Sequence, residues 1–250
     1  MGDGPINDLF EFVHTAADVD VLSMDASQTE HGLSMIDPRT GRVVIAVATT
    51  PHPIRQRSSI AHELGHVVAG DLDRPESLTP GERSPEEIRA DAFARHLLVP
   101  LEGARRRLSA IEDAPSLAHL SDLVQEFEVS PVLAAIQLRT LGLIDKDTCA
   151  DWCSLSTPYL AARYGWLSQY RSLVADSERP RAPQGLMARA VEGYRRGLLG
   201  IAEVALWYGQ DTAELQEQLD PHEAAVHDDW DNDWDSDAPL FPGERGEPAP

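Results

Sequence analysis

Lysine is almost absent from this sequence, and cysteines and long apolar runs are equally scarce. Lys146 is the only lysine among 21 basic residues, and 42 acidic residues give a formal net charge of −21. So acidic a chain argues against non-specific binding of nucleic acid over its whole surface. No segment approaches the roughly 18 consecutive apolar residues of a membrane span. The first residues lack the basic and apolar regions of a signal peptide, so we expect a cytoplasmic protein.

The two cysteines, Cys149 and Cys153, are spaced C-x₃-C. No histidine or further cysteine lies close to them in the sequence, so the pair is a poor metal site. Two cysteines also do not make a disulfide framework. The cysteine content therefore agrees with a reduced, cytoplasmic protein.

The strongest chemical signal is His62-Glu63-Leu64-Gly65-His66, the H-E-x-x-H pattern, in a stretch that we predict to be helical. Two imidazoles one helical turn apart project from the same face and can bind one tetrahedral ion. Glu63 lies on the flank of that face, where it can accept a proton from an attacking water without being a ligand. Two surface histidines at helical spacing would give the same pattern, so a third ligand has to decide.

The predicted motif helix has a separate apolar stripe and a face of small residues that carries the histidines. Gly65 lowers helix propensity by about 1 kcal/mol relative to alanine. This cost indicates that another part of the chain packs closely against the backbone there. The stripe consists of Ile60, Leu64, Val67 and Val68, and the histidine face also carries Arg55, Ser59 and Ala69.

A second helix is predicted from Ser84, an N-cap hydroxyl, with Pro85 at the first helical position. Glu87 and Asp91 lie on its apolar face, where an unpaired charge is costly. A zinc ion with its imidazoles would remove that cost. We therefore expect Glu87 as the third ligand and Asp91 as the partner of the outer N–H of a ligating histidine.

An alternative role for Glu87 stays open, because Ser84-x-x-Glu87 also spells a capping box. Asp91 is not explained by the capping box, since it lies one turn deeper on the inward face. The opposite face of the predicted helix carries Arg89, Arg95 and His96, which we expect in solvent, so His96 is not a candidate ligand.

These residues resemble the ImmA/IrrE family of metallo-endopeptidases over about residues 40–145. The resemblance is carried by Arg55-Gln56-Arg57, by Ala61 with the H-E-x-x-H motif, and by Glu87-x-x-Ala90-Asp91-x-Phe93-Ala94-x-x-Leu97-Leu98-x-Pro100.

The resemblance implies a small cytoplasmic zincin core, with Zn²⁺ held by His62, His66 and Glu87, and with Glu63 as general base. It also implies regulatory proteolysis in a stress, phage or mobile-element response. The substrate would be a helix-turn-helix (XRE-like) repressor or antitoxin. Some members of the family keep the pattern with little demonstrable peptidase activity. The alternative is therefore a non-cleaving zinc-binding module that binds a transcriptional repressor.

Before the motif we predict an amphipathic helix over residues 6–18 and three strands, Val19–Met24, His31–Ile36 and Arg42–Ala48, with a turn at residues 37–41. A small antiparallel sheet on the motif helix is the expected arrangement, and an edge strand there can pair with an extended substrate. An oxyanion-stabilising residue is not assigned, since His31 and His52 are nearest in sequence but neither has a spacing argument.

Residues 117–144 have the outline of a helix-turn-helix, joined at Val129-Ser130-Pro131. Their second helix offers only Arg139 as a cation, whereas a recognition helix needs several phosphate and base contacts. We interpret this pair as structural and do not expect direct DNA binding. The run Arg105-Arg106-Arg107 is interpreted as a solvated helix face.

Residues 158–219 are predicted helical, with breaks near residues 179–184 and at Gly209, and aromatic residues are concentrated there. We expect these aromatics to pack in the core, with a groove for a regulatory partner as the alternative. Residues 221–250 are acidic and proline-rich, which predicts disorder. Trp230 and Trp234 suggest that this tail docks on a basic partner or folds back over the cleft.

The sequence thus predicts a mostly helical α+β fold. The expected parts are a zincin-like core (1–105), a helix-turn-helix-like subdomain (106–148), a C-terminal helical region (149–220) and an acidic tail (221–250).

Overall fold

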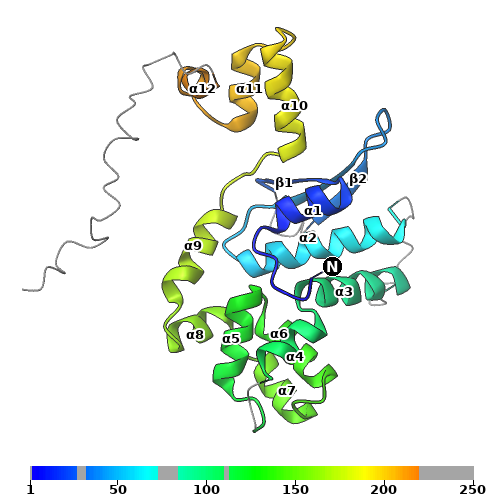
Figure 1. The fold of residues 1–250 in the computed structure, drawn as a ribbon, viewed down its shortest axis with the longest axis vertical. Helices are drawn as coiled ribbons and strands as arrows, with labels where there is room; N and C mark the ends of the chain where they lie inside the picture. Colours follow the sequence, from blue (N-terminus) through cyan, green and yellow to red (C-terminus); the bar gives the residue numbers. More distant parts are fainter. Residues whose placement is uncertain (1, 27–31, 73–83, 110–112, 220–250) are drawn as a thin grey trace, which may run out of the picture. The chain divides into compact units, whose positions relative to one another are not determined.

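The computed structural model describes residues 2–26, 32–72, 84–109 and 113–219. Its described residues form two compact units, one up to Leu199 and one from Gly200 onward. The mostly helical α+β class is confirmed by a small three-stranded sheet among many helices (Figure 1). The predicted boundaries at residues 105 and 148 stay predictions, and the tail with Trp230 and Trp234 lies outside the described residues.

The elements follow the chain as short helices and strands. The first unit holds α1 (Leu9–Ala17), β1 (Asp20–Met24), β2 (Gly32–Ile36), β3 (Val43–Ala48), α2 (Pro53–Ala69), α3 (Pro85–Leu98), α4 (Leu101–Arg107), α5 (Leu117–Phe127), α6 (Pro131–Thr140), α7 (Lys146–Cys153), α8 (Thr157–Arg163), α9 (Leu167–Ser177) and α10 (Gln184–Arg195). The second unit holds α11 (Ile201–Tyr208) and α12 (Thr212–Leu219).

The three predicted strands form a sheet of order β1-β3-β2. β2 and β3 make an antiparallel hairpin, closed by the predicted turn, in which the Asp37 amide donates to the Arg42 carbonyl at 2.8 Å. β1 pairs with β3 in parallel, so the sheet is mixed and not antiparallel throughout. The reason is that β3 lies between β1 and β2 in the sheet. The chain reverses direction from β1 to β2 and again from β2 to β3, so β1 and β3 run in the same direction.

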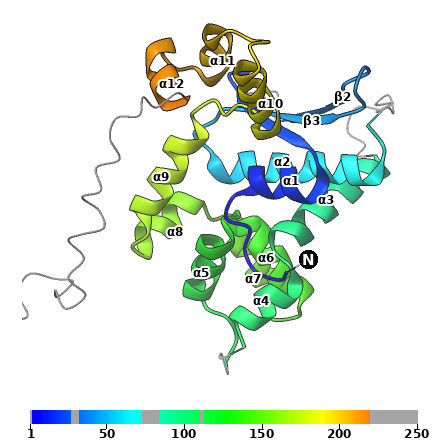
Figure 2. The same ribbon diagram turned by 45° about the horizontal axis from the view of Figure 1, so that its top comes forward.

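The motif helix α2 forms the middle layer of the first unit, between the sheet and α3 (Figure 2). Its core side is made by Ile60 and Leu64, which are 0% and 3% exposed. Val68 was expected in the same stripe but is 63% exposed, because it lies in the last turn of the helix. The helix ends at Gly70, whose left-handed φ of 70° allows its amide to cap the carbonyls of the last turn.

Gly65 permits the close approach of α3 that its low helix propensity suggested. A Cβ at this position would lie 3.0 Å from the Ala90 Cα and 3.3 Å from its Cβ. The facing pairs His62 with Asp91 and His66 with Glu87 run in opposite directions along the two helices. α2 and α3 are therefore antiparallel, and they approach each other closely at Gly65, which lies between the two motif histidines in the sequence.

The residues just ahead of the motif hold α2 in place. The side-chain amide of Gln56 donates to the backbone carbonyls of Ala48 at 3.1 Å and Ser177 at 3.2 Å. Arg57 donates to the Ile6 carbonyl at 2.6 Å and pairs with Glu128 at 3.0 Å. The motif helix is thus tied to the N-terminal segment, to the end of β3, and to α5 and α9.

The helix pair α5–α6 is packed into the first unit, which agrees with a structural role. Gln137 of α6 is fully buried, and its amide donates to the Val99 carbonyl at 2.6 Å. The basic run on α4 is a solvated face, as predicted. Its three arginines pair there with acidic side chains, Arg105 with Glu102, Arg106 with Asp3, and Arg107 with Asp122 and Glu126.

The C-terminal aromatics divide between core and surface. Trp166 is buried, and its indole N–H donates to the Ser121 hydroxyl at 3.0 Å. Tyr159, Trp207 and Tyr208 are 43%, 45% and 42% exposed, so the prediction of a core role is wrong for these three. The predicted breaks near residues 179–184 and at Gly209 are confirmed.

Candidate metal centre

Three predicted ligand residues from two helices converge on one point. The Nε2 atoms of His62 and His66 are 3.1 Å apart. The two carboxylate oxygens of Glu87 each lie 3.2 Å from one of these nitrogens. Ligand atoms at about 2.0–2.1 Å from a tetrahedral zinc ion are about 3.3 Å from one another. The three distances are therefore close to the ligand separations of a zinc site, and one ligand atom from each of the three residues lies within 4.8 Å of the others.

The outer nitrogens of both imidazoles face carboxylates. His62 Nδ1 lies 2.9 Å from Asp91 Oδ1, and His66 Nδ1 lies 2.9 Å from Asp71 Oδ1. A neutral imidazole that donates from Nδ1 presents the lone pair of Nε2. Two such lone pairs and a carboxylate that point at one centre repel each other, and a divalent cation at that centre removes the repulsion. The donor set and its orientation thus suit a metal ion.

The alternative role of Glu87 as a capping-box residue is only half realised. The Ser84 hydroxyl accepts a hydrogen bond from the Glu87 amide at 3.2 Å and so caps α3. The Glu87 carboxylate, however, contacts both imidazoles, with one oxygen 3.2 Å from each Nε2. The backbone of Glu87 starts the helix, while its side chain belongs to the cluster.

Asp71 is a partner that the sequence analysis missed. It follows Gly70, just beyond the end of α2, and its side chain is 3% exposed. It also pairs with Arg89 of α3. Burial by itself raises the pKa of Asp71, but hydrogen bonds from Arg89 and His66 outweigh burial and hold that pKa below its ordinary value. The carboxylate is thereby kept ionised as an acceptor for the His66 N–H.

Glu63 contacts β2. Its Oε2 accepts a hydrogen bond of 2.7 Å from the Ser34 hydroxyl. A Cβ at Gly32 would lie 3.0 Å from Glu63 Cγ, so the absence of a side chain there leaves room for the glutamate. Gly32 and Ser34, which alternate along β2, therefore confine the Glu63 side chain. Neither residue was identified from the sequence.

A cleft of about 1330 Å³ runs over the cluster. His62, Glu63 and His66 line it from α2, and β2 and α6 contribute walls. Arg95 also lines the cleft, so its expected place on the solvated face of α3 is wrong. Its neighbour His96 is exposed, as expected.

The other candidates lie elsewhere. His52 is exposed at the start of α2, ten residues before His62, and His31 lies outside the described residues. Cys149 and Cys153 are free thiols, and burial together with Cys149 raises the pKa of Cys153, which disfavours the metal-binding thiolate. Within the described ranges, the cluster of His62, His66 and Glu87 is the only group with metal-ligand geometry.

Comparison with protein families agrees with this geometry. The model of the IrrE N-terminal-like domain, Peptidase_M78, matches residues 15–139, half of the 250-residue chain. The chain belongs to this family. Peptidase_M78 is a family of zinc metallopeptidases, and the match spans the sheet, α2, α3 and the α5–α6 pair. No curated protein matches the sequence. No helix in the described part of this Peptidase_M78 protein is long and apolar enough to cross a membrane.

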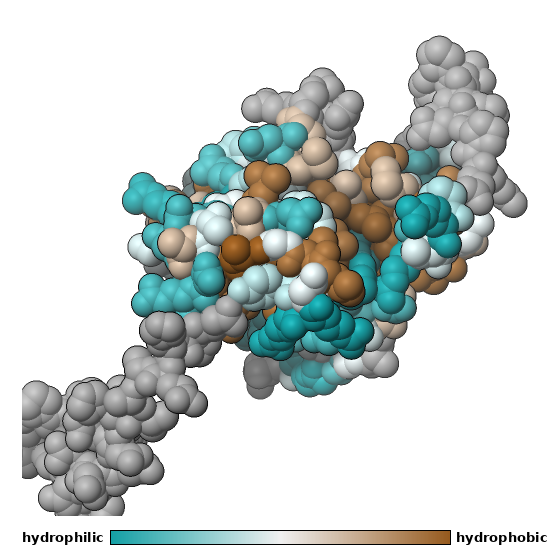
Figure 3. All heavy atoms as spheres, turned by 90° about the horizontal axis from the view of Figure 1, so that it is seen from above, coloured by the Kyte–Doolittle hydropathy of each residue, from teal (hydrophilic) through white to brown (hydrophobic). Residues whose placement is uncertain are grey.

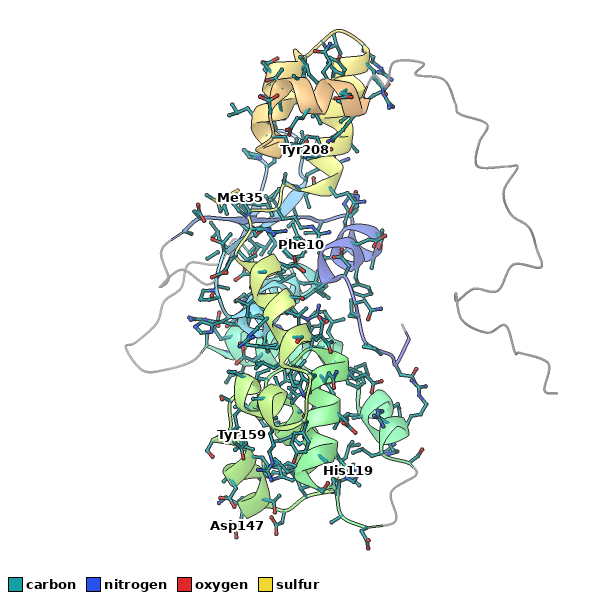
Figure 4. The ribbon with its side chains drawn as sticks, turned by 90° about the vertical axis from the view of Figure 1, so that its left-hand side faces the viewer. Phe10, Met35, His119, Asp147, Tyr159 and Tyr208 are labelled. Carbon is teal, nitrogen blue, oxygen red and sulfur yellow. The ribbon has the colours of Figure 1, made fainter. Side chains whose placement is uncertain are left out.

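The two carboxylates behind the imidazoles lead to a prediction on metal affinity. Asp71→Asn and Asp91→Asn should each weaken zinc binding by about 10- to 100-fold, because the amide holds a ligating histidine less firmly. Competition with a chromophoric chelator measures this. Asp147→Asn is the matched control, since Figure 4 shows Asp147 at the far end of the first unit from Met35 of β2. Wild-type affinity in both cleft variants would contradict the prediction.

Proposed function

We propose that this protein is a zinc-dependent endopeptidase of regulatory type. The observation that carries the proposal is the convergence of His62, His66 and Glu87 within 3.2 Å of one another, with Glu63 in the same cleft. Two histidines, one glutamate and an open fourth position form one of the established catalytic zinc sites.

The side chains around this point have complementary tasks. A bound zinc ion would supply a Lewis acid for the scissile carbonyl and for the attacking water. Glu63 would accept the proton of that water and deliver it to the leaving amine. The Ser34 hydroxyl, 2.7 Å from Glu63, would limit the positions that this carboxylate takes between the two transfers. Asp71 and Asp91 would keep both imidazoles in the ligating tautomer.

β2 is suited to present a substrate to this cluster. It is an edge strand, and among the described residues no strand pairs with its outer side. Its backbone can therefore pair with an extended peptide by strand addition. Apolar residues reach the surface among hydrophilic ones on the face drawn in Figure 3, and in this sheet Met24, Leu33 and Met35 are 49%, 56% and 50% exposed. We propose β2 as the strand that binds the substrate backbone.

The partner follows from the resemblance to ImmA/IrrE proteins. We propose as substrate a helix-turn-helix (XRE-like) repressor or antitoxin in the cytoplasm, in a stress, phage or mobile-element response. The non-cleaving alternative would keep the same zinc site and bind the repressor without hydrolysis.

The test is incubation of the zinc-loaded protein with helix-turn-helix (XRE-like) repressors or antitoxins from the same organism. Mass spectrometry should find two fragments whose masses sum to the substrate plus one water. A chelator should stop the cleavage, and added zinc should restore it, because the proposed Lewis acid is removable. Stable binding without fragments, at any zinc concentration, would favour the non-cleaving alternative.

A further inference from the structure

Arg95 differs from the other arginines of α2 and α3 whose contacts the structure gives. Arg57 pairs with Glu128, and Arg89 pairs with Asp71. For Arg95 none of the described carboxylates lies within ion-pair distance, and this missing ion pair is the difference. Its Nε, like that of Arg57, is buried without a hydrogen-bond acceptor. A buried donor without an acceptor is costly. Arg95 is one of the residues that line the cleft, so a bound molecule can come close to its unpaired charge.

The position of Arg95 follows from the antiparallel packing of α2 and α3. Eight residues of α-helix separate it from Glu87, which is a distance of about 12 Å along the axis. The pairs His66–Glu87 and His62–Asp91 continue toward Ser58 and Ser59, both of which line the cleft. Arg95 therefore lies beside the path of a peptide, on the α2 N-terminal side of the metal cluster.

An apolar wall stands next to this cation. Val132, Leu133 and Ile136 of α6 line the same cleft, and Val132 is 41% exposed. Gln137 fixes the wall, because its amide donates to the Val99 carbonyl at 2.6 Å and to the Arg95 carbonyl at 3.4 Å. The end of α3 and the start of α6 thus hold one positive charge against an aliphatic surface.

We propose that this end of the cleft is a specificity site for an acidic side chain of the substrate, with an apolar neighbour packed on α6. An extended chain rises about 3.3 Å per residue. The acidic side chain would therefore stand about two to four residues from the scissile bond. The inference rests on the proposed peptidase function and adds the chemistry of its substrate.

The overall acidity of the chain does not oppose this choice. Exposed charges more than about 8–10 Å apart are largely screened at physiological ionic strength. A partly buried guanidinium acts at short range, and its planar N–H groups match a carboxylate in a bidentate way. A lysine or arginine of the substrate at this place would meet repulsion from Arg95.

The first test is cleavage of a peptide library in which the positions around the scissile bond vary. The wild type should prefer Asp or Glu over Asn or Gln at one position by about ten- to a hundredfold, the range of a hydrogen-bonded charge pair. Arg95→Glu should reverse this preference toward Lys or Arg. Arg139→Glu, the same charge change on the exposed side of α6, should keep the wild-type profile. An unchanged profile in Arg95→Glu would overturn the proposal.

A binding measurement separates this inference from the proposed function. Zinc-loaded Glu63→Gln protein should bind a peptide with Asp or Glu at the selected position more tightly than the same peptide with Asn or Gln there. A second substitution, Arg95→Ala, should remove this difference in affinity. If the wild type does not cleave any peptide but this difference in affinity is found, the binding site for an acidic side chain is supported and the peptidase function is refuted. If the two peptides bind equally with Arg95 present, the specificity site is refuted, whatever the activity.

Discussion

Glu63→Gln should lower the rate of peptide cleavage by about 10²- to 10⁴-fold, the usual contribution of a general acid–base group. Glutamine has nearly the same shape and still accepts the hydrogen bond from Ser34, which is 2.7 Å long in the wild type. It cannot accept the proton of the attacking water. The fold and the metal ligands are unchanged by the substitution, so the loss should appear in kcat with little change in KM.

Two measurements on the same preparation give this result its meaning. Metal analysis should find wild-type zinc content in Glu63→Gln, and Glu102→Gln on the exposed surface of α4 should cleave at the wild-type rate. A Glu63→Gln enzyme within a few-fold of wild type would remove the general base from the mechanism. A regulatory output that persists in this variant would favour the non-cleaving alternative.

Glu87→Ala should abolish stoichiometric zinc binding and with it cleavage. The substitution removes one of the three proposed protein ligands. Loss of a carboxylate that only holds a ligating histidine lowers metal affinity by up to about 100-fold, so the loss of a ligand should lower zinc affinity by more than that. Far-UV circular dichroism should be unchanged, because the Glu87 amide remains capped by the Ser84 hydroxyl. Isothermal titration with zinc checks the affinity.

Glu102→Ala is the control for Glu87→Ala, since it removes an exposed glutamate that pairs only with a neighbouring arginine. It should bind one zinc ion at wild-type affinity. One tightly held zinc ion per chain in Glu87→Ala would show that the third ligand is another residue.

The sequence could predict that His62, His66 and Glu87 form a candidate metal site, because helical geometry determines which face of each helix they occupy. The spacing of His62 and His66 places both imidazoles on one face, and Glu87 lies on the inward face of its own helix. Gly65 predicted a close contact with another part of the chain, and the structure shows that this part is α3. The motif that resembles the ImmA/IrrE family consists of residues on these same two helices.

Asp71 and Ser34 could not be predicted in the same way, because they reach the site from other elements. Asp71 depends on how the chain turns after Gly70, and Ser34 depends on which strand lies beside Glu63. The parallel pairing of β1 with β3 is also a matter of strand order, which local patterns do not specify. The positions of Asp71 and Ser34 and the pairing of β1 with β3 all depend on how distant parts of the chain pack together.

Arg95 shows the limit of a helical wheel. It lies about 40° from Asp91, at the border between the inward and outward faces of α3. A helical wheel places Arg95 with Arg89 and His96 on the solvated face, whereas residues of α6 line the same cleft as Arg95. Whether a residue at the border of a helix face lies in a cleft or in solvent depends on the element packed beside it. The sequence of α3 alone does not say which element that is.

X-ray absorption spectroscopy of the zinc-loaded wild type tests the central claim most directly. We expect one zinc ion per chain with two imidazole nitrogens and carboxylate oxygen at about 2.0–2.2 Å, and no sulfur. The imidazole signal should drop in His62→Ala. A sulfur shell at about 2.3 Å, from Cys149 and Cys153, or a spectrum without imidazole would contradict the claim that α2 and α3 together form the metal site.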